Sequence, residues 1–180
     1  MATLFVDKLD PQSGTALEIR SSGDTITIPS GATLTNNGTA TGFASSTPAF
    51  LATRDSNQSI SANTTTKIQY DDESFDTDNT YDNSSNYRFT PGVSGKYVIG
   101  ASAGVDTQSD HNHLSVEIRK NGTAIAYVID ANQHLGVRNM TIIDDANTTD
   151  YYEVFLRQDN GTENTTASAA IMYFWGYKLA

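Results

Sequence analysis

Acidic side chains gather between residues 71 and 82, in a stretch that also contains Asn and Thr. Within it, Asp76, Asp78 and Thr80 have the spacing of the first oxygen ligands of an EF-hand calcium loop. The sixth position of that motif lacks its glycine and the twelfth lacks its glutamate, so an EF-hand is excluded. We expect a solvated acidic loop and no cofactor. A calcium site of another geometry is the alternative.

His111 and His113 place two imidazoles on the same face of an extended strand. His134 is the only other histidine, so a single chain can hardly complete a zinc or nickel site. A metal site shared by subunits at a trimer axis is the alternative. Hydrogen-bonded surface histidines are the favoured interpretation, and no metal is expected.

Catalytic signatures are weak in this sequence. Ser, His and Asp are all present, which leaves a Ser–His–Asp set open, but we expect no nucleophile elbow. The acidic stretch could supply the carboxylate pair of a glycosidase. Glycan-cutting fibre proteins are usually much longer than 180 residues, however, so we predict that the chain is not an enzyme.

The composition restricts the partners of the protein. Its net charge is −10 and its pI is near 4.5, whereas nucleic-acid binding needs basic surface, so no nucleic acid is expected. The sequence lacks cysteine, which excludes disulfides and thiolate zinc sites. No run is long enough for membrane insertion, and the first residues lack the pattern of a signal peptide, so we expect synthesis in the cytoplasm.

The positioning elements are predicted to be β-strands throughout. The clearest strand follows the turns at Pro91-Gly92 and Ser94-Gly95, and Asn121-Gly122 is the strongest hairpin signal because a type I′ turn needs two residues that tolerate positive φ. Strands are predicted at residues 48–53, 59–62, 65–70, 87–90, 96–105, 113–120, 123–129, 136–144, 150–157 and 166–179, with loops at 71–85 and 159–165. Such a series without helices indicates an antiparallel sandwich or barrel.

The last predicted strand is apolar on both faces. One face carries Ile171, Tyr173 and Trp175, and the other carries Ala170, Met172 and Phe174. A strand of an antiparallel sandwich normally has one solvated face. We therefore expect the outer face of this strand to meet another subunit. Cover by the N-terminal arm is the alternative.

Residues 1–45 are predicted to form an extended arm ahead of a domain at residues 46–180. The arm alternates short apolar segments with turns but holds too few apolar side chains for a core of its own. Its regularly spaced apolar residues favour an arm that becomes ordered in an assembly, by docking or by interlacing within a trimer, over a flexible tail. The docking residues are predicted to be Leu4, Val6, Leu17, Ile19, Ile26 and Ile28.

Several segments of residues 46–180 resemble the C1q-like (C1q/TNF-type) jelly roll. They are Pro48-Ala49-Phe50, Tyr81-Asp82, Phe89, Pro91-Gly92, Gly95-Lys96-Tyr97, Lys120-Asn121-Gly122 and Phe174-Trp175-Gly176-Tyr177-Lys178-Leu179. This resemblance implies an all-β antiparallel jelly-roll sandwich that forms a homotrimer, with the C-terminal strand towards the threefold axis. The trimer interface is then predicted at Phe50, Ile171, Tyr173 and Trp175.

The first 45 residues are similar to N-terminal segments of structural proteins of tailed phages, especially marine phages. Together the two resemblances imply a virion surface protein made in the host cytoplasm: a capsid decoration or cement protein whose arm docks on the major capsid protein or another virion protein. A tail-fibre tip or adhesin that binds a host-surface receptor or glycan is the first alternative, with Tyr81, Tyr87 and Tyr127 as candidate contacts. A glycan-cleaving enzyme is the second.

Overall fold

The computed structural model describes residues 27, 29–33, 35, 37, 47–106, 111–130 and 136–179 of the chain. The chain divides into the units Met1–Phe43 and Ala44–Ala180, and every strand of the described residues lies in the second unit, called the head below. The six predicted docking residues of the arm lie outside the described residues. No helix of the described part is long and apolar enough to span a bilayer.

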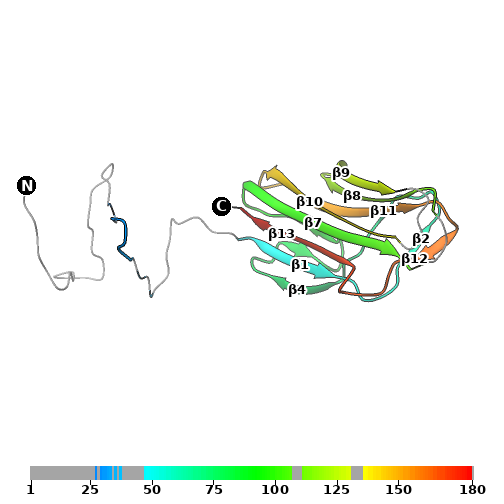
Figure 1. Ribbon diagram of the computed structural model, residues 1–180, viewed down its shortest axis with the longest axis horizontal. Coiled ribbons are helices and arrows are strands. Elements are labelled where there is room, and N and C mark those ends of the chain that lie inside the picture. Colours follow the sequence, from blue (N-terminus) through cyan, green and yellow to red (C-terminus); the bar gives the residue numbers. More distant parts are fainter. Residues whose placement is uncertain are drawn as a thin grey trace, which may run out of the picture. The chain divides into compact units, whose positions relative to one another are not determined.

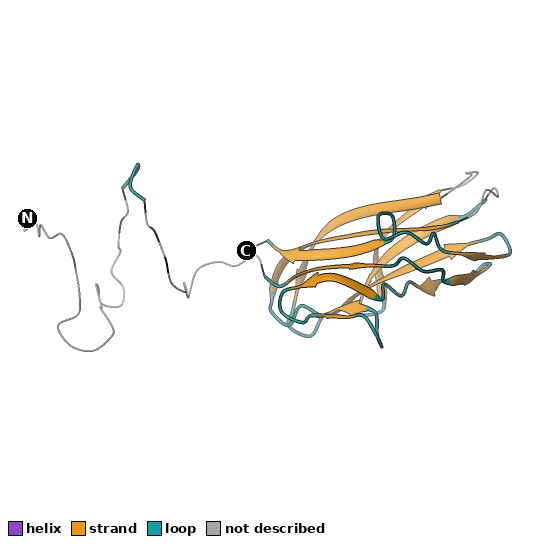
Figure 2. Cartoon of the chain, turned by 90° about the horizontal axis from the view of Figure 1, so that it is seen from below, coloured by secondary structure: helices purple, strands orange, loops and turns teal. Residues whose placement is uncertain are grey.

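The head is built from antiparallel β-strands in two layers (Figures 1 and 2), which confirms the all-β prediction. The first sheet has the order β10-β7-β13-β1-β4, formed by β10 (Gly136–Ala146), β7 (Gly95–Val105), β13 (Tyr173–Lys178), β1 (Ala49–Thr53) and β4 (Asp72–Asp76). The second has the order β5-β6-β11-β8-β9, formed by β5 (Tyr81–Asp82), β6 (Arg88–Phe89), β11 (Tyr152–Gln158), β8 (Leu114–Lys120) and β9 (Thr123–Asp130). Strand β3 (Thr66–Lys67) pairs with β11, and β2 (Ser59–Ser61) pairs with β12 (Thr162–Asn164).

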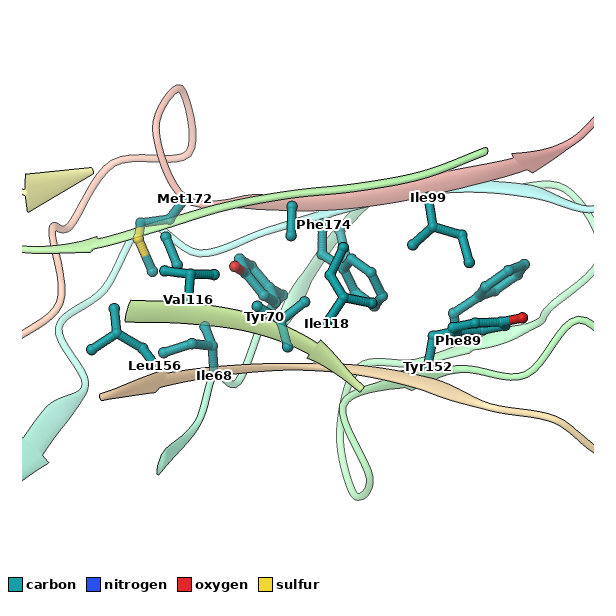
Figure 3. Close-up of a cluster of buried hydrophobic side chains, with 14 of the residues drawn as sticks. Ile68, Tyr70, Phe89, Ile99, Val116, Ile118, Tyr152, Leu156, Met172 and Phe174 are labelled. Atoms are coloured by element: carbon teal, nitrogen blue, oxygen red, sulfur yellow. The ribbon is translucent and has the colours of Figure 1, made fainter. Parts of the chain in front are cut away.

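The core fills the space between the two sheets (Figure 3), because alternate residues of each strand point inward. In β13 and the turn before it, Met172 and Phe174 are fully buried, as the period of two predicts. Phe174 lies edge-on to Phe50 at 5.0 Å between ring centroids, and Phe50 stacks on Phe89 at 4.4 Å. This aromatic cluster joins the first sheet to the second and fixes which face of β13 is the inner one.

The β8–β9 hairpin turns at Asn121-Gly122 with φ of 53° and 80°, which confirms the predicted two-residue turn. The Asn121 side chain fastens this hairpin to the next one, since its Nδ2 donates to the Asp150 carboxylate at 2.7 Å and its Oδ1 accepts from the Tyr151 amide at 3.0 Å. Asp150 also accepts from the Asn147 amide at 2.8 Å and pairs with Lys120 at 3.1 Å. The Asn147 amide and the other donors lower the pKa of Asp150 to about 2.

Asp150 should therefore make the head sensitive to acid. Because its pKa is lower in the folded chain than the ordinary 3.8, the ionised carboxylate stabilises the fold above pH 4, and this contribution is lost as the pH falls towards about 2. We expect Asp150→Asn to lower the free energy of unfolding near neutral pH by about 1.5–3 kcal/mol, the contribution of a charged hydrogen-bond acceptor. Urea unfolding across the acid range measures this. A difference from wild type that does not shrink with acidification would contradict the assignment.

Three predicted boundaries are wrong. The predicted loop at 71–85 contains β4 and β5, the predicted loop at 159–165 contains β12, and regular pairing of the last strand begins only at Tyr173. Strands β4 and β5 each have one neighbour in their sheets, so they need few apolar side chains and their polar composition hides them. The residues before β13 form a turn, where the Ile171 and Met172 amides donate to the Ser168 carbonyl.

Candidate functional site

The outer face of the first sheet carries a band of apolar side chains, called the apolar sheet face below. The register places residues of five strands in two adjacent rows: Ile143, Val98, Tyr177 and Ala49 in one row, and Thr141, Gly100, Trp175, Leu51 and Phe75 in the next. In the single chain, Ile143 is 66 % exposed, Phe75 50 % and Tyr177 38 %. Apolar side chains that span a whole sheet on its solvent side are typical of an interaction surface.

Trp175 is the centre of the apolar sheet face. Its ring packs directly against the paired residue Gly100 of β7. The contact is so close that a Cβ atom at position 100 would stand only 2.3 Å from the indole. The ring also stacks on Tyr177, at 6.1 Å between centroids and 14° between planes. A groove of about 410 Å³ lies beside it, lined by Ala49, Phe50, Leu51, Phe75, Trp175, Gly176 and Tyr177. Glycine at position 100 therefore shapes a flat aromatic platform with an apolar groove next to it.

A second apolar stripe lies on β9, the last strand of the other sheet. Ile125, Tyr127 and Ile129 alternate along it and are 40 %, 68 % and 50 % exposed. Strand β9 pairs with β8 alone, so its other edge has no strand partner among the described residues. The head thus has two exposed apolar surfaces on different sheets, one on the face of the first sheet and one along the edge strand β9 of the second.

The residues predicted for the trimer interface fall on two sides of the sheet. Tyr173 and Trp175 are half-buried and point outward, as their alternation with the buried Phe174 in β13 requires. Ile171 is half-buried in the turn before β13. Phe50 is 1 % exposed and belongs to the core, so its assignment to the interface is corrected. In β1 the side chains of Ala49 and Leu51 point outward. The sequence does not indicate which of two adjacent residues faces the core, because Phe50 and Leu51 are both large and apolar. Phe75 and Ile143 were also missed.

The candidate receptor contacts are not brought together as a set. Tyr81 is 4 % exposed and stacks on Phe50 at 5.0 Å, so it is a core residue and its prediction as a contact is corrected. Tyr87 is half-buried and has a φ of 49°, which is rare for an aromatic residue. Tyr127 is exposed on β9.

The acidic stretch is internally hydrogen-bonded. The Asp76 carboxylate accepts from the amides of Asp78, Thr80 and Tyr81. Asp82 accepts from the Ser85 amide at 2.8 Å and from other groups of the same turn, and the Ser85 hydrogen bond is the main cause that lowers its pKa to about 2. These two carboxylates stabilise the loop by accepting hydrogen bonds from its backbone amides.

His111 differs from the surface histidine that was expected. It is 1 % exposed, and its Nε2 lies 2.6 Å from the Glu163 carboxylate. His113 is half-buried beside Ser115, 3.0 Å from its hydroxyl, and burial lowers its pKa. In the part of the chain that the structure describes, no three His, Asp or Glu side chains are placed to hold a metal ion.

The sequence contains one catalytic motif that was not predicted. Residues 100–104 read Gly-Ala-Ser-Ala-Gly, which has the form of a nucleophile elbow. The structure places all five residues inside the extended strand β7, with Ser102 only 2 % exposed. A nucleophile elbow needs a sharp turn that exposes the serine, so this serine is structural.

Solved structures share this architecture at low sequence identity. Eiger TNF from S. frugiperda aligns with a TM-score of 0.57 and 9 % identity over 73 % of this chain and 92 % of that chain. The globular domain of zebrafish complement 1qA protein aligns with a TM-score of 0.54 and 13 % identity over 74 % and 98 %. PRD1 vertex protein P5 aligns with a TM-score of 0.54 and 12 % identity over 76 % and 100 %. No described protein family and no curated protein sequence matches the chain. At these identities the likeness concerns the fold, and the head is a jelly roll of the C1q/TNF type.

Proposed function

We propose that the protein is a non-enzymatic structural component of a tailed-phage virion: a homotrimeric capsid decoration or cement protein that faces outward through its head. The observation that carries this proposal is the apolar sheet face, which one chain leaves open across five strands. Exposed apolar patches of this extent usually become buried in an assembly. The likeness to a vertex protein supports a place on a virion shell.

The two apolar surfaces favour a ring over a twofold dimer. In a twofold dimer one patch meets its own copy, whereas a head-to-tail contact joins two different patches and forms a ring when the rotation between subunits closes. Trp175 at the centre of the sheet face and Tyr127 on the β9 edge supply two such patches. We therefore propose that the β9 edge of one subunit contacts the apolar sheet face of the next. The C1q/TNF-type fold supports a ring of three subunits.

Residues 1–45 are proposed to anchor the head on the major capsid protein or another virion protein. Addition of a short strand to the edge of a neighbouring sheet is a common recognition mode, and the arm alternates apolar residues as such strands do. Leu4, Val6, Leu17, Ile19, Ile26 and Ile28 would be the anchoring residues.

A tail-fibre tip or adhesin is the second candidate. Its specific support is the exposure of Tyr127, whose ring is large and rigid enough to serve as a contact with a receptor. In this role the protein would be present in few copies and would contact the host, not the capsid.

Virion composition and arm deletion test the proposal together. Quantitative mass spectrometry of purified virions should find hundreds of copies per particle, whereas a handful would indicate the tail. A chain that lacks residues 1–45 should form intact trimers but should not be incorporated into particles, because the anchor is missing. The full-length chain expressed in the same way is the control, and unimpaired incorporation of the truncated chain would contradict the docking role.

A further inference from the structure

A polar hollow lies at one open side of the sandwich, between the edge strand β4 of the first sheet and strands β5 and β6 of the second. It has a volume of about 610 Å³, within the range of ligand sites. We call it the edge hollow. Every residue that lines it has a polar side chain, and Glu73 from β4 faces Asp82 and Arg88 from β5 and β6 across it.

The loop that forms the rim of the edge hollow is held in place from within. Asp82 accepts from the Ser84 and Ser85 amides at 3.1 and 2.8 Å and from the Asn86 side chain at 2.6 Å. Asp76 accepts from the Thr80 and Tyr81 amides behind the hollow. The rim is therefore built before any ligand arrives, which lowers the entropy cost of binding.

Other polar groups of the edge hollow accept or donate no hydrogen bond to the residues that the structure describes. Within the described residues, the side chains of Glu73, Asn79 and Asn83 make no hydrogen bond or ion pair, although Glu73 and Asn83 are half-buried. Arg88 stacks its guanidinium on the Tyr151 ring at 4.5 Å, and its N–H groups form no hydrogen bond within the described residues. Burial, followed by the charges of Asp76, Asp82 and Asp72, raises the pKa of Glu73.

The chemistry of these groups selects the class of ligand. An apolar ligand finds no aliphatic side chain in the lining, and an anionic ligand would meet Glu73 and Asp82. A cation would lack a cluster of carboxylates, because no three His, Asp or Glu side chains of the described residues are placed to hold a metal ion, and the Asp82 oxygens already accept hydrogen bonds from the loop. A neutral ligand with several hydroxyl groups can donate to the Glu73 carboxylate and accept from the amides of Asn79 and Asn83.

We propose that the edge hollow is a binding site for a neutral saccharide unit, with Glu73, Asn79, Asn83 and Arg88 as its hydrogen-bonding groups. The site is independent of the proposed trimer, because Glu73 and Phe75 lie on opposite sides of β4. An irregularity in the pairing of β4 with β1 places Phe75 beside the outward Leu51 and Glu73 beside the inward Ala52. It would give a virion surface protein a way to hold the sugars of a cell envelope.

Saturation-transfer NMR on the full chain tests the proposal, with the methyl glycosides of glucose, galactose, mannose and N-acetylglucosamine as probes at millimolar concentration. We expect transfer to at least one probe. The double variant Glu73→Gln/Asn83→Ala should weaken this binding at least tenfold, because two of the hydrogen-bonding groups are lost. Asp55→Asn, which removes one exposed carboxylate outside the hollow, should bind as wild type does.

Three results would overturn the saccharide site: no transfer to any of the four probes, equal transfer in the double variant, or binding of calcium chloride alone with no response to the sugars. Thermal unfolding of the same samples shows whether the variants are folded. Glu73→Gln should not lower the melting temperature, since it removes one charge from among like charges. Sedimentation of these samples reports the trimer separately, so a failure of either proposal is recognised on its own.

Discussion

We expect Trp175→Asp to convert the proposed trimer into folded monomers. Its side chain lies on the outer side of the sheet, against Gly100 and Tyr177, and not among the core residues. A carboxylate at the centre of an apolar interface would lose its hydration without gaining a partner, and a buried charge without a partner costs about 3–5 kcal/mol. The jelly roll itself keeps its core, so the monomer should remain folded.

Sedimentation velocity and circular dichroism together measure this outcome. The matched control is Thr162→Asp, which adds the same charge at an exposed position on β12, a strand that pairs with β2 and is not part of the first sheet. The control should behave as wild type. If Trp175→Asp sedimented as wild type does, the apolar sheet face would not be the contact between subunits. An unfolded variant would mean that Trp175 belongs to the core.

The neighbouring residue should give the opposite result. Phe174→Ala should lower the free energy of unfolding by about 3–5 kcal/mol, because it removes a fully buried ring and leaves a cavity. The ring contacts Phe50, Tyr70 and Tyr81, which come from both sides of the sandwich. Substitutions at the adjacent residues Trp175 and Phe174 should therefore distinguish an effect on subunit assembly from an effect on folding.

This second prediction is best measured in the Trp175→Asp background, since subunit association otherwise adds to the apparent stability. Urea unfolding of Phe174→Ala is compared there with that of Phe75→Ala, whose ring is half-exposed. The Phe75 variant should lose about 1 kcal/mol or less. Equal losses in the two variants would contradict the placement of Phe174 in the core.

The strongly periodic parts of the fold could be predicted from the sequence. The core residues of β7 and β11 and the two faces of β13 follow from the period of two in their large apolar residues, although in β7 the residues of the other face are buried as well. The turn at Asn121-Gly122 follows from backbone chemistry alone. Resemblance to C1q-like proteins added the jelly-roll topology, which periodicity cannot supply because it carries no information on strand order.

Other features of the fold and the site depend on tertiary context that the sequence does not display. Strand β4 is acidic and pairs with β1 alone, so nothing in its composition distinguishes it from a loop. Strand β1 contains adjacent large apolar residues, Phe50 and Leu51, and only the stacking of Phe50 with Phe89 decides which of them faces inward. Tyr81 was likewise expected to be an exposed receptor contact, but its ring is packed in the core.

The edge hollow illustrates the same limit. Its groups come from β4, from β5 and β6, and from the loops between them, and the sequence shows them only as a polar, acidic stretch. The stretch does not show that the carboxylates of Asp76 and Asp82 accept hydrogen bonds from backbone amides. Nor does it show that the side chains of Glu73 and Asn83 have no hydrogen-bond partner in the described part of the chain. Only the three-dimensional structure shows which polar side chains hold the loop and which remain able to bind a ligand.

Native mass spectrometry of the unaltered full-length chain tests the central claim most directly. The proposed burial of the apolar sheet face in a head-to-tail ring predicts a single species of three chains, each of 19.4 kDa, that persists on dilution. A species with the mass of one chain at the same concentrations would contradict it, because the exposed side chains of Ile143, Phe75 and Tyr177 would then have no subunit to cover them.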